Sequence, residues 1–186
     1  MDSNVDIPEI TTDRLVLRAF SGSDAMPLHR ILGQEGVLRY FPSTDPPPLE
    51  KVEQFIAGQL RHWEKHGYGW WAVVPQGEGE LIGWSGLQYL PDTDEVEIAY
   101  LLARAYWGQG LAPEAARAGL AFGFEWLGLE RIVAIVHVDN AASQRVAEKL
   151  GMTFDQEAEY FGIPCYRYAM HVVSWQRIAT APEGGL

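Results

Sequence analysis

Small residues alternate through the stretch Trp107–Ala115. Gly108, Gly110 and Ala112 leave almost no side chain there, so that backbone N–H groups can come close to a large ligand. Pro113 has a fixed φ that suits the first position of a helix, and an apolar helical run follows it. The first N–H groups of a helix lack internal partners and carry roughly half a positive charge. The stretch therefore predicts a site for the pyrophosphate of a coenzyme, although a tight turn without a ligand fits the same residues.

A second candidate for chemistry is a carboxylate within a predicted strand. Residues alternate between two faces through Glu95–Leu102, and Glu97 shares its face with Ala99 and Leu101. A carboxylate beside a covered sheet is costly to bury unless it has a partner or a function, and burial would raise its pKa. Glu97 is therefore a candidate general base, with Glu95 as the fallback. A solvated or ion-paired glutamate on the sheet is the alternative interpretation.

Hydrophobic periodicity predicts the elements that would position these residues, because alternation is typical of strands and spacings of three and four are typical of helices. The predicted elements are a strand Thr12–Arg18, a helix Ala25–Leu32, a loop Phe41–Pro48, a helix Leu49–His66, strands Gly69–Val74, Glu80–Leu90 and Glu95–Leu102, a helix from Pro113 to near Gly128, a strand Arg131–Val138, a helix Ala141–Leu150, and aromatic strand segments from Met152 to Trp175. This order predicts an α/β fold with a mixed sheet covered by helices. We see no repeat or linker, and expect one domain over residues 1–186 with loose tails at 1–9 and 179–186.

Composition excludes several classes of function. The 186 residues are 47% hydrophobic and 21% charged, as in soluble globular proteins. The net charge of −11 disfavours nucleic-acid binding and is compatible with a cationic amine substrate. No apolar run could span a membrane, and we expect no membrane partner. Because Cys165 is the only cysteine and the histidines show no metal-ligand spacing, we expect no disulfide, no metal and a cytoplasmic location.

Three passages are similar to motifs of one known family. Thr12–Arg18 is similar to the first strand of one of its branches. Trp107–Ala112 lies where the family's Arg/Gln-x-x-Gly-x-Gly/Ala loop binds a coenzyme pyrophosphate, and Asn140–Met152 resembles its second coenzyme motif, Asn-x-x-Ser…Glu-Lys-x-Gly-Phe. The chain thus resembles the GNAT superfamily of acyl-CoA-dependent N-acetyltransferases, and most of all its RimJ/RimL-type branch, named for enzymes that acetylate ribosomal-protein N-termini. The likeness spans roughly residues 12–175.

The resemblance implies a mostly antiparallel mixed sheet in which two parallel strands, here Glu95–Leu102 and Arg131–Val138, splay apart around the coenzyme. It implies acetyl-CoA as cosubstrate and a primary amine as acceptor, either a protein N-terminus or a small molecule. The amides of the coenzyme's pantetheine arm would bond to the freed strand edge. The residues that the resemblance assigns to coenzyme binding are Tyr100, Leu101, Leu102, Trp107, Gly108, Gln109, Gly110, Leu111, Ala112, Asn140 and Ser143.

Acetyl transfer to an amine needs a base for the amine proton, stabilisation of an oxyanion, and a proton for the departing thiolate. The resemblance places Glu97 at the position of the glutamate base of several members. It places Ser143 at the position of a proposed acid, for which a structural hydrogen bond or a coenzyme contact is the alternative. Other candidate acids are Tyr160, Tyr166 and Tyr168.

Three departures from the family pattern leave a second hypothesis open. Trp107 replaces the usual Arg or Gln, Pro113 replaces a frequent Thr, and Ala147 stands where many members have a tyrosine acid. The alternative is therefore a catalytically weak or silent coenzyme-A-binding regulatory module. A P-loop nucleotide site is set aside because the Gly-Lys-Ser/Thr ending is missing. The acceptor is left open, and so is a homodimer.

Overall fold

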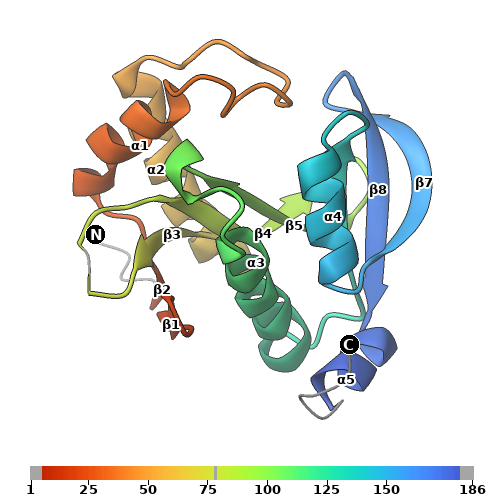
Figure 1. Cartoon of the computed structure of the whole chain (residues 1–186). Coiled ribbons are helices and arrows are strands. Elements are labelled where there is room, and N and C mark those ends of the chain that lie inside the picture. Colours follow the sequence, from red (N-terminus) through yellow and green to blue (C-terminus); the bar gives the residue numbers. More distant parts are fainter. Residues whose placement is uncertain (1–5, 78, 181–186) are drawn as a thin grey trace.

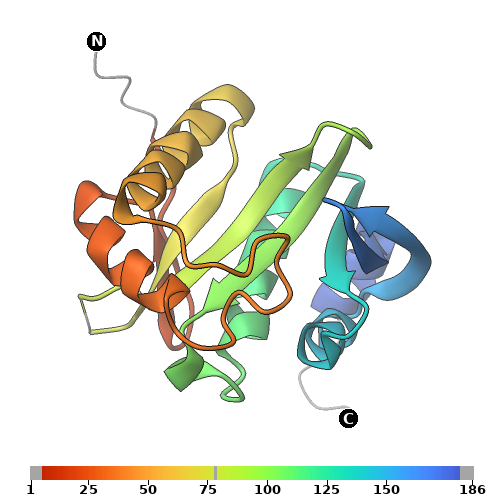
Figure 2. The same ribbon diagram turned by 90° about the horizontal axis from the view of Figure 1, so that it is seen from above.

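The computed structural model describes residues 6–77 and 79–180, which form one open sheet of eight strands with helices on both faces (Figures 1 and 2). The strand order is β1-β2-β3-β4-β5-β6-β8-β7, and all neighbours are antiparallel except β5 and β6. The elements are β1 Ile10–Thr11, β2 Leu15–Arg18, α1 Ala25–Leu32, α2 Leu49–His66, β3 Trp70–Pro75, β4 Gly83–Leu90, β5 Glu95–Leu102, α3 Leu111–Ala121, β6 Arg131–His137, α4 Ala141–Lys149, β7 Thr153–Tyr160, β8 Ile163–His171 and α5 Val172–Ala179, with short 3-10 helices at Gly22–Asp24 and Arg104–Tyr106 and a π-helical turn at Phe122–Trp126. The predicted fold class is confirmed.

The strand β3 shows how the two faces of the sheet are covered. Trp71 and Val73 pack into the core between the sheet and α3, whereas Ala72 and Val74 pack against α1 and α2 on the other face. This alternation is the period-2 pattern of a strand buried on both sides. In Figure 1, α1 and α2 accordingly lie above the sheet and α3 below it. The helix α4 packs on the same side as α3, through Ala147 and Leu150.

The parallel strands β5 and β6 pair with each other over a very short stretch. Antiparallel pairing of β4 with β5 runs along the whole strand, from Gly83–Leu102 to Leu90–Glu95. In contrast, β5 and β6 share the single register pair Glu97–Val133 and part beyond it. The predicted splayed strands are therefore present, and the parting begins at Glu97.

Several predicted boundaries were wrong. The predicted strand Thr12–Arg18 is divided into β1 and β2 by a turn in which the Leu15 N–H donates to Thr12 Oγ1 at 3.1 Å. The helix α3 begins at Leu111, two residues before Pro113. Because the first helical N–H groups need no internal acceptor, a proline as third residue costs no hydrogen bond.

The helix α5 was missed, since Met152–Trp175 was predicted to hold strand segments. It begins with two β-branched valines, which are typical of strands. It is anchored by Trp175, which stacks on Phe124 with the ring centroids 5.7 Å apart. Residues 1–5 and 181–186 of the predicted tails lie outside the described residues. Within the first tail, the Pro8 carbonyl accepts a hydrogen bond from Trp71 Nε1 at 2.8 Å.

Candidate functional site

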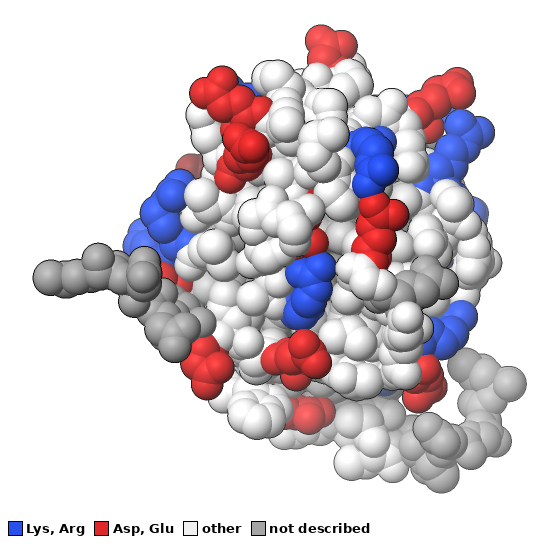
Figure 3. Space-filling view, turned by 90° about the vertical axis from the view of Figure 1, so that its left-hand side faces the viewer, with Lys and Arg blue, Asp and Glu red and all other residues white. Residues whose placement is uncertain are grey.

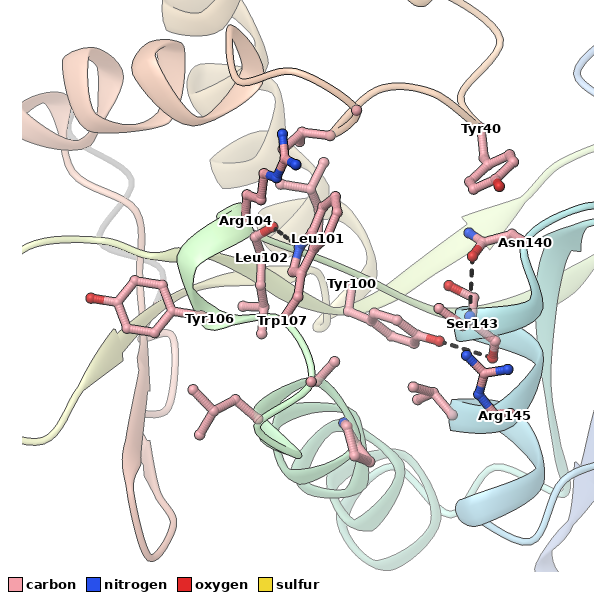
Figure 4. Close-up of a pocket in the computed structure, with 18 of the residues that line it drawn as sticks. Tyr40, Tyr100, Leu101, Leu102, Arg104, Tyr106, Trp107, Asn140, Ser143 and Arg145 are labelled. Atoms are coloured by element: carbon pink, nitrogen blue, oxygen red, sulfur yellow. Dashed lines mark hydrogen bonds between the residues drawn. The ribbon is translucent and has the colours of Figure 1, made fainter.

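A cavity of about 630 Å³ lies where β5 and β6 part (Figure 4). Its walls are the end of β5, the turn Trp107–Gly110 (called the glycine turn below), the first turns of α3 and α4, and residues 35–41 between α1 and α2. Such a volume is typical of small-molecule sites. All the predicted coenzyme-binding residues line it except Gln109, whose side chain donates to the Ala105 carbonyl at 2.7 Å.

The glycine turn exposes its backbone to this cavity. Gly108 and Gly110 have φ of +72° and +76°, a left-handed conformation that favours glycine. The first backbone hydrogen bond of α3 runs from the Glu114 N–H to the Gly110 carbonyl of the turn, at 3.3 Å. The N–H groups of Leu111 and Ala112 precede it at the helix start, so that they are available to an anion at the positive end of α3.

Sequence reasoning missed a brace behind this turn. Glu114 accepts hydrogen bonds from Thr12 Oγ1 at 2.7 Å and from the Arg14 N–H and Nε at 2.9 and 2.7 Å. Arg14 also donates to the Gln109 carbonyl at 2.9 Å. Although burial acts to raise the pKa of Glu114, the hydrogen bonds from Thr12 and Arg14 outweigh it and lower that pKa. The turn between β1 and β2 thereby holds both Gln109 and Glu114 in place.

The edge of β5 that faces the cavity carries polar backbone groups. The Ala103 N–H donates to the Ile82 carbonyl of the neighbouring chain segment at 2.8 Å, so by alternation Tyr100 and Leu102 turn their backbone groups toward the opening. Trp107 Nε1 donates a hydrogen bond to the Leu102 carbonyl at 2.7 Å, so that this carbonyl already has a partner. This gives Trp107 a structural partner that the family pattern did not indicate, and leaves the freed edge around Tyr100.

The opposite wall is the first turn of α4. Asn140 caps this helix, because its side chain accepts the Ser143 N–H at 3.1 Å. The Ser143 backbone carbonyl accepts the Tyr100 hydroxyl across the opening at 3.3 Å, and Figure 4 shows the Tyr100 side chain directed at the first turn of α4. Burial raises the pKa of Tyr100 to about 12, which keeps that hydroxyl protonated. Within the described residues, the Ser143 hydroxyl makes no hydrogen bond and lines the cavity.

The other candidate acids do not face the cavity. Tyr160, Tyr166 and Tyr168 lie on β7 and β8 and are absent from its lining. Ala147, at the position of the family's tyrosine acid, is buried in the core. Among the candidate acids from sequence, only Ser143 borders the cavity, and the Tyr100 hydroxyl that donates to its carbonyl lies next to it.

Glu97 is buried at the apex of the opening, with 5% of its surface exposed. Its carboxylate accepts Gln88 Nε2 at 2.7 Å and the Ile135 N–H at 3.3 Å. Burial raises the pKa of Glu97 to about 7, against the opposing effect of these two hydrogen bonds. Glu97 does not itself line the cavity. The fallback Glu95 is ion-paired with Arg131 and, at 2.9 Å, with Arg167, which gives it a structural role.

Three cations at the cavity were also missed by the sequence analysis. Arg39, Arg145 and Lys149 line it, and among the described residues none of them makes an ion pair. Arg145 and Lys149 are four residues apart on α4, which places them on one face of that helix. Unpaired cations in a chain of net charge −11 favour a multiply charged anion in this cavity.

Two other residues have packing roles. His137 packs against Tyr40 with the two rings tilted and their centroids 5.3 Å apart, and its Nδ1 accepts the Asp139 N–H at 3.0 Å. Cys165 is buried, and burial raises the pKa of its thiol to about 11, so that it stays a thiol at neutral pH.

On the face in Figure 3, acidic and basic side chains of the described residues are interspersed and do not form a basic patch.

Comparison with known proteins decides the family. A model described as "Acetyltransferase (GNAT) domain" matches residues 14–153, more than half of the chain. The chain belongs to the GNAT acetyltransferase family. This GNAT domain is therefore an acetyl-CoA-dependent N-acetyltransferase, as the sequence predicted.

Its relatives agree with that assignment. "Uncharacterized N-acetyltransferase YoaA" of Bacillus subtilis (strain 168) is 33% identical over 149 residues, 77% of this chain and 82% of YoaA. The acetyltransferase structure from Agrobacterium tumefaciens str. C58 has a TM-score of 0.79 at 29% identity, with 89% and 95% of the two chains covered. "RimL- Ribosomal L7/L12 alpha-N-protein acetyltransferase in complex with Coenzyme A" shares the fold, with a TM-score of 0.77 at 22% identity and 90% and 99% covered. The predicted GNAT family is confirmed by the family model, and the RimL structure shows that this enzyme has the same fold.

Over residues 6–77 and 79–180, no helix is both long and apolar enough to cross a membrane. The same residues contain no group of three or more His, Cys, Asp and Glu side chains placed to hold a metal ion.

Proposed function

We propose that this GNAT domain binds acetyl-CoA in the opening between β5 and β6 and transfers the acetyl group to a primary amine. The observation that carries the proposal is the start of α3, where the bare N–H groups of Leu111 and Ala112 border a cavity between parted strands. The left-handed glycines at 108 and 110 keep that turn free of side chains, which suits a bulky diphosphate. Bound acetyl-CoA would supply an activated acetyl thioester.

The remaining cavity residues suit other parts of the coenzyme. The backbone edge around Tyr100 fits the amides of pantetheine, because its N–H and carbonyl groups have lost their β6 partners. Arg145 and Lys149 would neutralise phosphate charge at the outer end of the cavity. Asn140 would shape the wall indirectly, as the cap that fixes the start of α4.

We propose Glu97 as the general base. A pKa of about 7 lets its carboxylate hold and release a proton near neutral pH, which is the range a base needs. Because Glu97 is buried beside the cavity and does not line it, the amine proton would reach it through a water molecule. Its position at the apex of the opening supports this route.

Ser143 is the proposed donor of the proton to the departing coenzyme sulfur. Replacing Ser143 with Ala should lower kcat about tenfold and leave the Kd for coenzyme A within about twofold, since only one donor is lost. Steady-state kinetics and calorimetric titration measure the two quantities. Tyr100→Phe is the comparison variant, because it removes the hydroxyl that donates to the Ser143 carbonyl. Wild-type turnover of Ser143→Ala would make Ser143 merely structural.

The acceptor is proposed to be a protein N-terminus, as the name of RimL suggests, or a small cationic amine, as the net charge of −11 favours. A panel of N-terminal peptides, polyamines, amino acids and aminoglycosides, read out by thiol release, tests this directly. We expect release that depends on one class of amine. Tight coenzyme binding with no acceptor-dependent release would favour the silent regulatory module, which the missing tyrosine at Ala147 keeps as the second candidate.

We propose that the protein is located in the cytoplasm. Cys165 is the only cysteine of the chain, and this favours the reducing cytoplasm. The homodimer stays a prediction, which light scattering coupled to gel filtration would test.

A further inference from the structure

The parting of β5 and β6 has no origin in the backbone pairing around it. The β4–β5 register is continuous from Gly83–Leu102 to Leu90–Glu95, so that no bulge bends β5 away from its neighbour. The β6–β8 register is also continuous, from Arg131–His171 onward. Both strands are regular on their outer sides, yet they stop pairing with each other after one register pair. The outer neighbours of the two strands thus give no reason for the parting.

Alternation identifies the hydrogen bond at which pairing stops. Since Ala103 bonds toward β4, the residues of β5 whose backbone groups face β6 include Ile98 and Tyr100. In a continued parallel ladder beyond Glu97–Val133, the next donor on β6 is the Ile135 N–H and its acceptor is the Ile98 carbonyl. That N–H donates instead to the Glu97 carboxylate, at 3.3 Å.

We propose that Glu97 is also a positioning residue, whose carboxylate ends the β5–β6 ladder by taking the Ile135 N–H and thereby holds the coenzyme opening apart in the free protein. The other carboxylate oxygen accepts Gln88 Nε2 at 2.7 Å, and this bond fixes the side chain from the paired strand β4. Both carboxylate oxygens are thus occupied by neighbours on opposite sides of β5. A buried N–H needs an acceptor, so that a side chain without one at position 97 would release Ile135 to Ile98.

A second contact acts further along the opening. The Tyr100 hydroxyl reaches the Ser143 carbonyl at 3.3 Å, and the Tyr100 ring thereby stands between β5 and α4 (Figure 4). Glu97 at the apex and Tyr100 beyond it keep the cavity preformed, which spares the coenzyme the cost of opening it. The inference rests on the proposed binding of coenzyme A in this cavity, and adds a role for Glu97 that is independent of proton transfer.

Two substitutions at position 97 separate this role from base catalysis. Glu97→Gln keeps an oxygen that can accept the Ile135 N–H, whereas Glu97→Leu has a similar volume and no acceptor. Calorimetric titration of the full chain with coenzyme A should give Glu97→Gln a Kd within about twofold of wild type. Glu97→Leu should bind about tenfold more weakly or worse, because the closed opening must first be unpaired.

Glu95→Leu is the matched control, as the same substitution one period earlier on β5 and outside the opening. It removes ion pairs to Arg131 and Arg167, and its Kd for coenzyme A should stay within about threefold of wild type. Equal affinities of folded Glu97→Leu and Glu97→Gln would overturn the inference. Coenzyme binding too weak to measure in the wild-type protein would instead overturn the proposed function.

Amide hydrogen exchange of the wild-type protein gives a test that needs no variant. The Ile135 amide should be protected without coenzyme, because Glu97 already binds it. In Glu97→Gln it should remain protected. Exchange of this amide at the rate of an exposed loop amide in the coenzyme-free wild-type protein would contradict the proposed contact.

Discussion

Gly110→Glu should weaken coenzyme A binding by about 100-fold or more, the largest loss of affinity that we expect from any single substitution. Gly110 has φ of +76°, which strains a residue with a side chain, and it stands directly before the free N–H groups of α3. A carboxylate there adds bulk and like charge at the place proposed for the diphosphate. Calorimetric titration with coenzyme A measures the loss.

Gly128→Glu is the control for backbone strain and added charge. Gly128 has φ of +67°, has open space around its Cα and lies beyond the end of the α3 region, away from the cavity. It should cost stability as Gly110→Glu does, while coenzyme affinity stays within about twofold of wild type. Normal coenzyme binding by Gly110→Glu, or an equal loss in both variants, would count against the diphosphate site.

Glu97→Gln should lower kcat about 100- to 1000-fold, since it removes a general base and preserves the shape of the side chain. The wild-type rate should rise with pH through about 7, because Glu97 accepts a proton only once it is ionised and its pKa is raised to about 7. In Glu97→Gln that rise should disappear. A pH–rate profile from pH 5 to 9 at saturating acetyl-CoA and amine tests both points.

Glu95→Gln serves as the control for this measurement. Its carboxylate is ion-paired with Arg131 and Arg167, so that neutralising it should cost stability and leave the shape of the pH–rate profile unchanged. If Glu97→Gln kept the wild-type profile, Glu97 would have no part in proton transfer. Its proposed role in separating the strands would not be affected by that result.

Secondary structure was predicted correctly where a long segment shows one clear hydrophobic period. The helix α2, Leu49–His66, has the predicted bounds, because its buried stripe begins after a proline loop and its end is set by Gly67, a glycine with φ of +73°. The short helix α5 was not predicted, since Val172 and Val173 suggest a strand. Its Trp175 is fixed by tertiary contacts, which are stacking on Phe124 and a hydrogen bond from its Nε1 to Glu125 at 2.9 Å. Short elements depend on their tertiary contacts more than on local pattern.

In the candidate site, too, local features were predicted and contacts between distant residues were not. The turn at Gly108 and the α4 cap at Asn140 are local features, and the sequence located both beside the cavity. The contacts between distant residues were not predictable from one sequence, because neither spacing nor composition pairs residues that are 38 or 100 positions apart. The brace between Arg14 and Glu114 is such a contact, and so is the bond from Ile135 to Glu97.

The most direct test of the account is a crystal structure of the chain grown with coenzyme A. The account predicts the diphosphate on the N–H groups of Leu111 and Ala112, with the pantetheine arm passing between β5 and β6 beside Tyr100. A coenzyme bound elsewhere, or β5 and β6 hydrogen-bonded along their full length in that crystal, would contradict it.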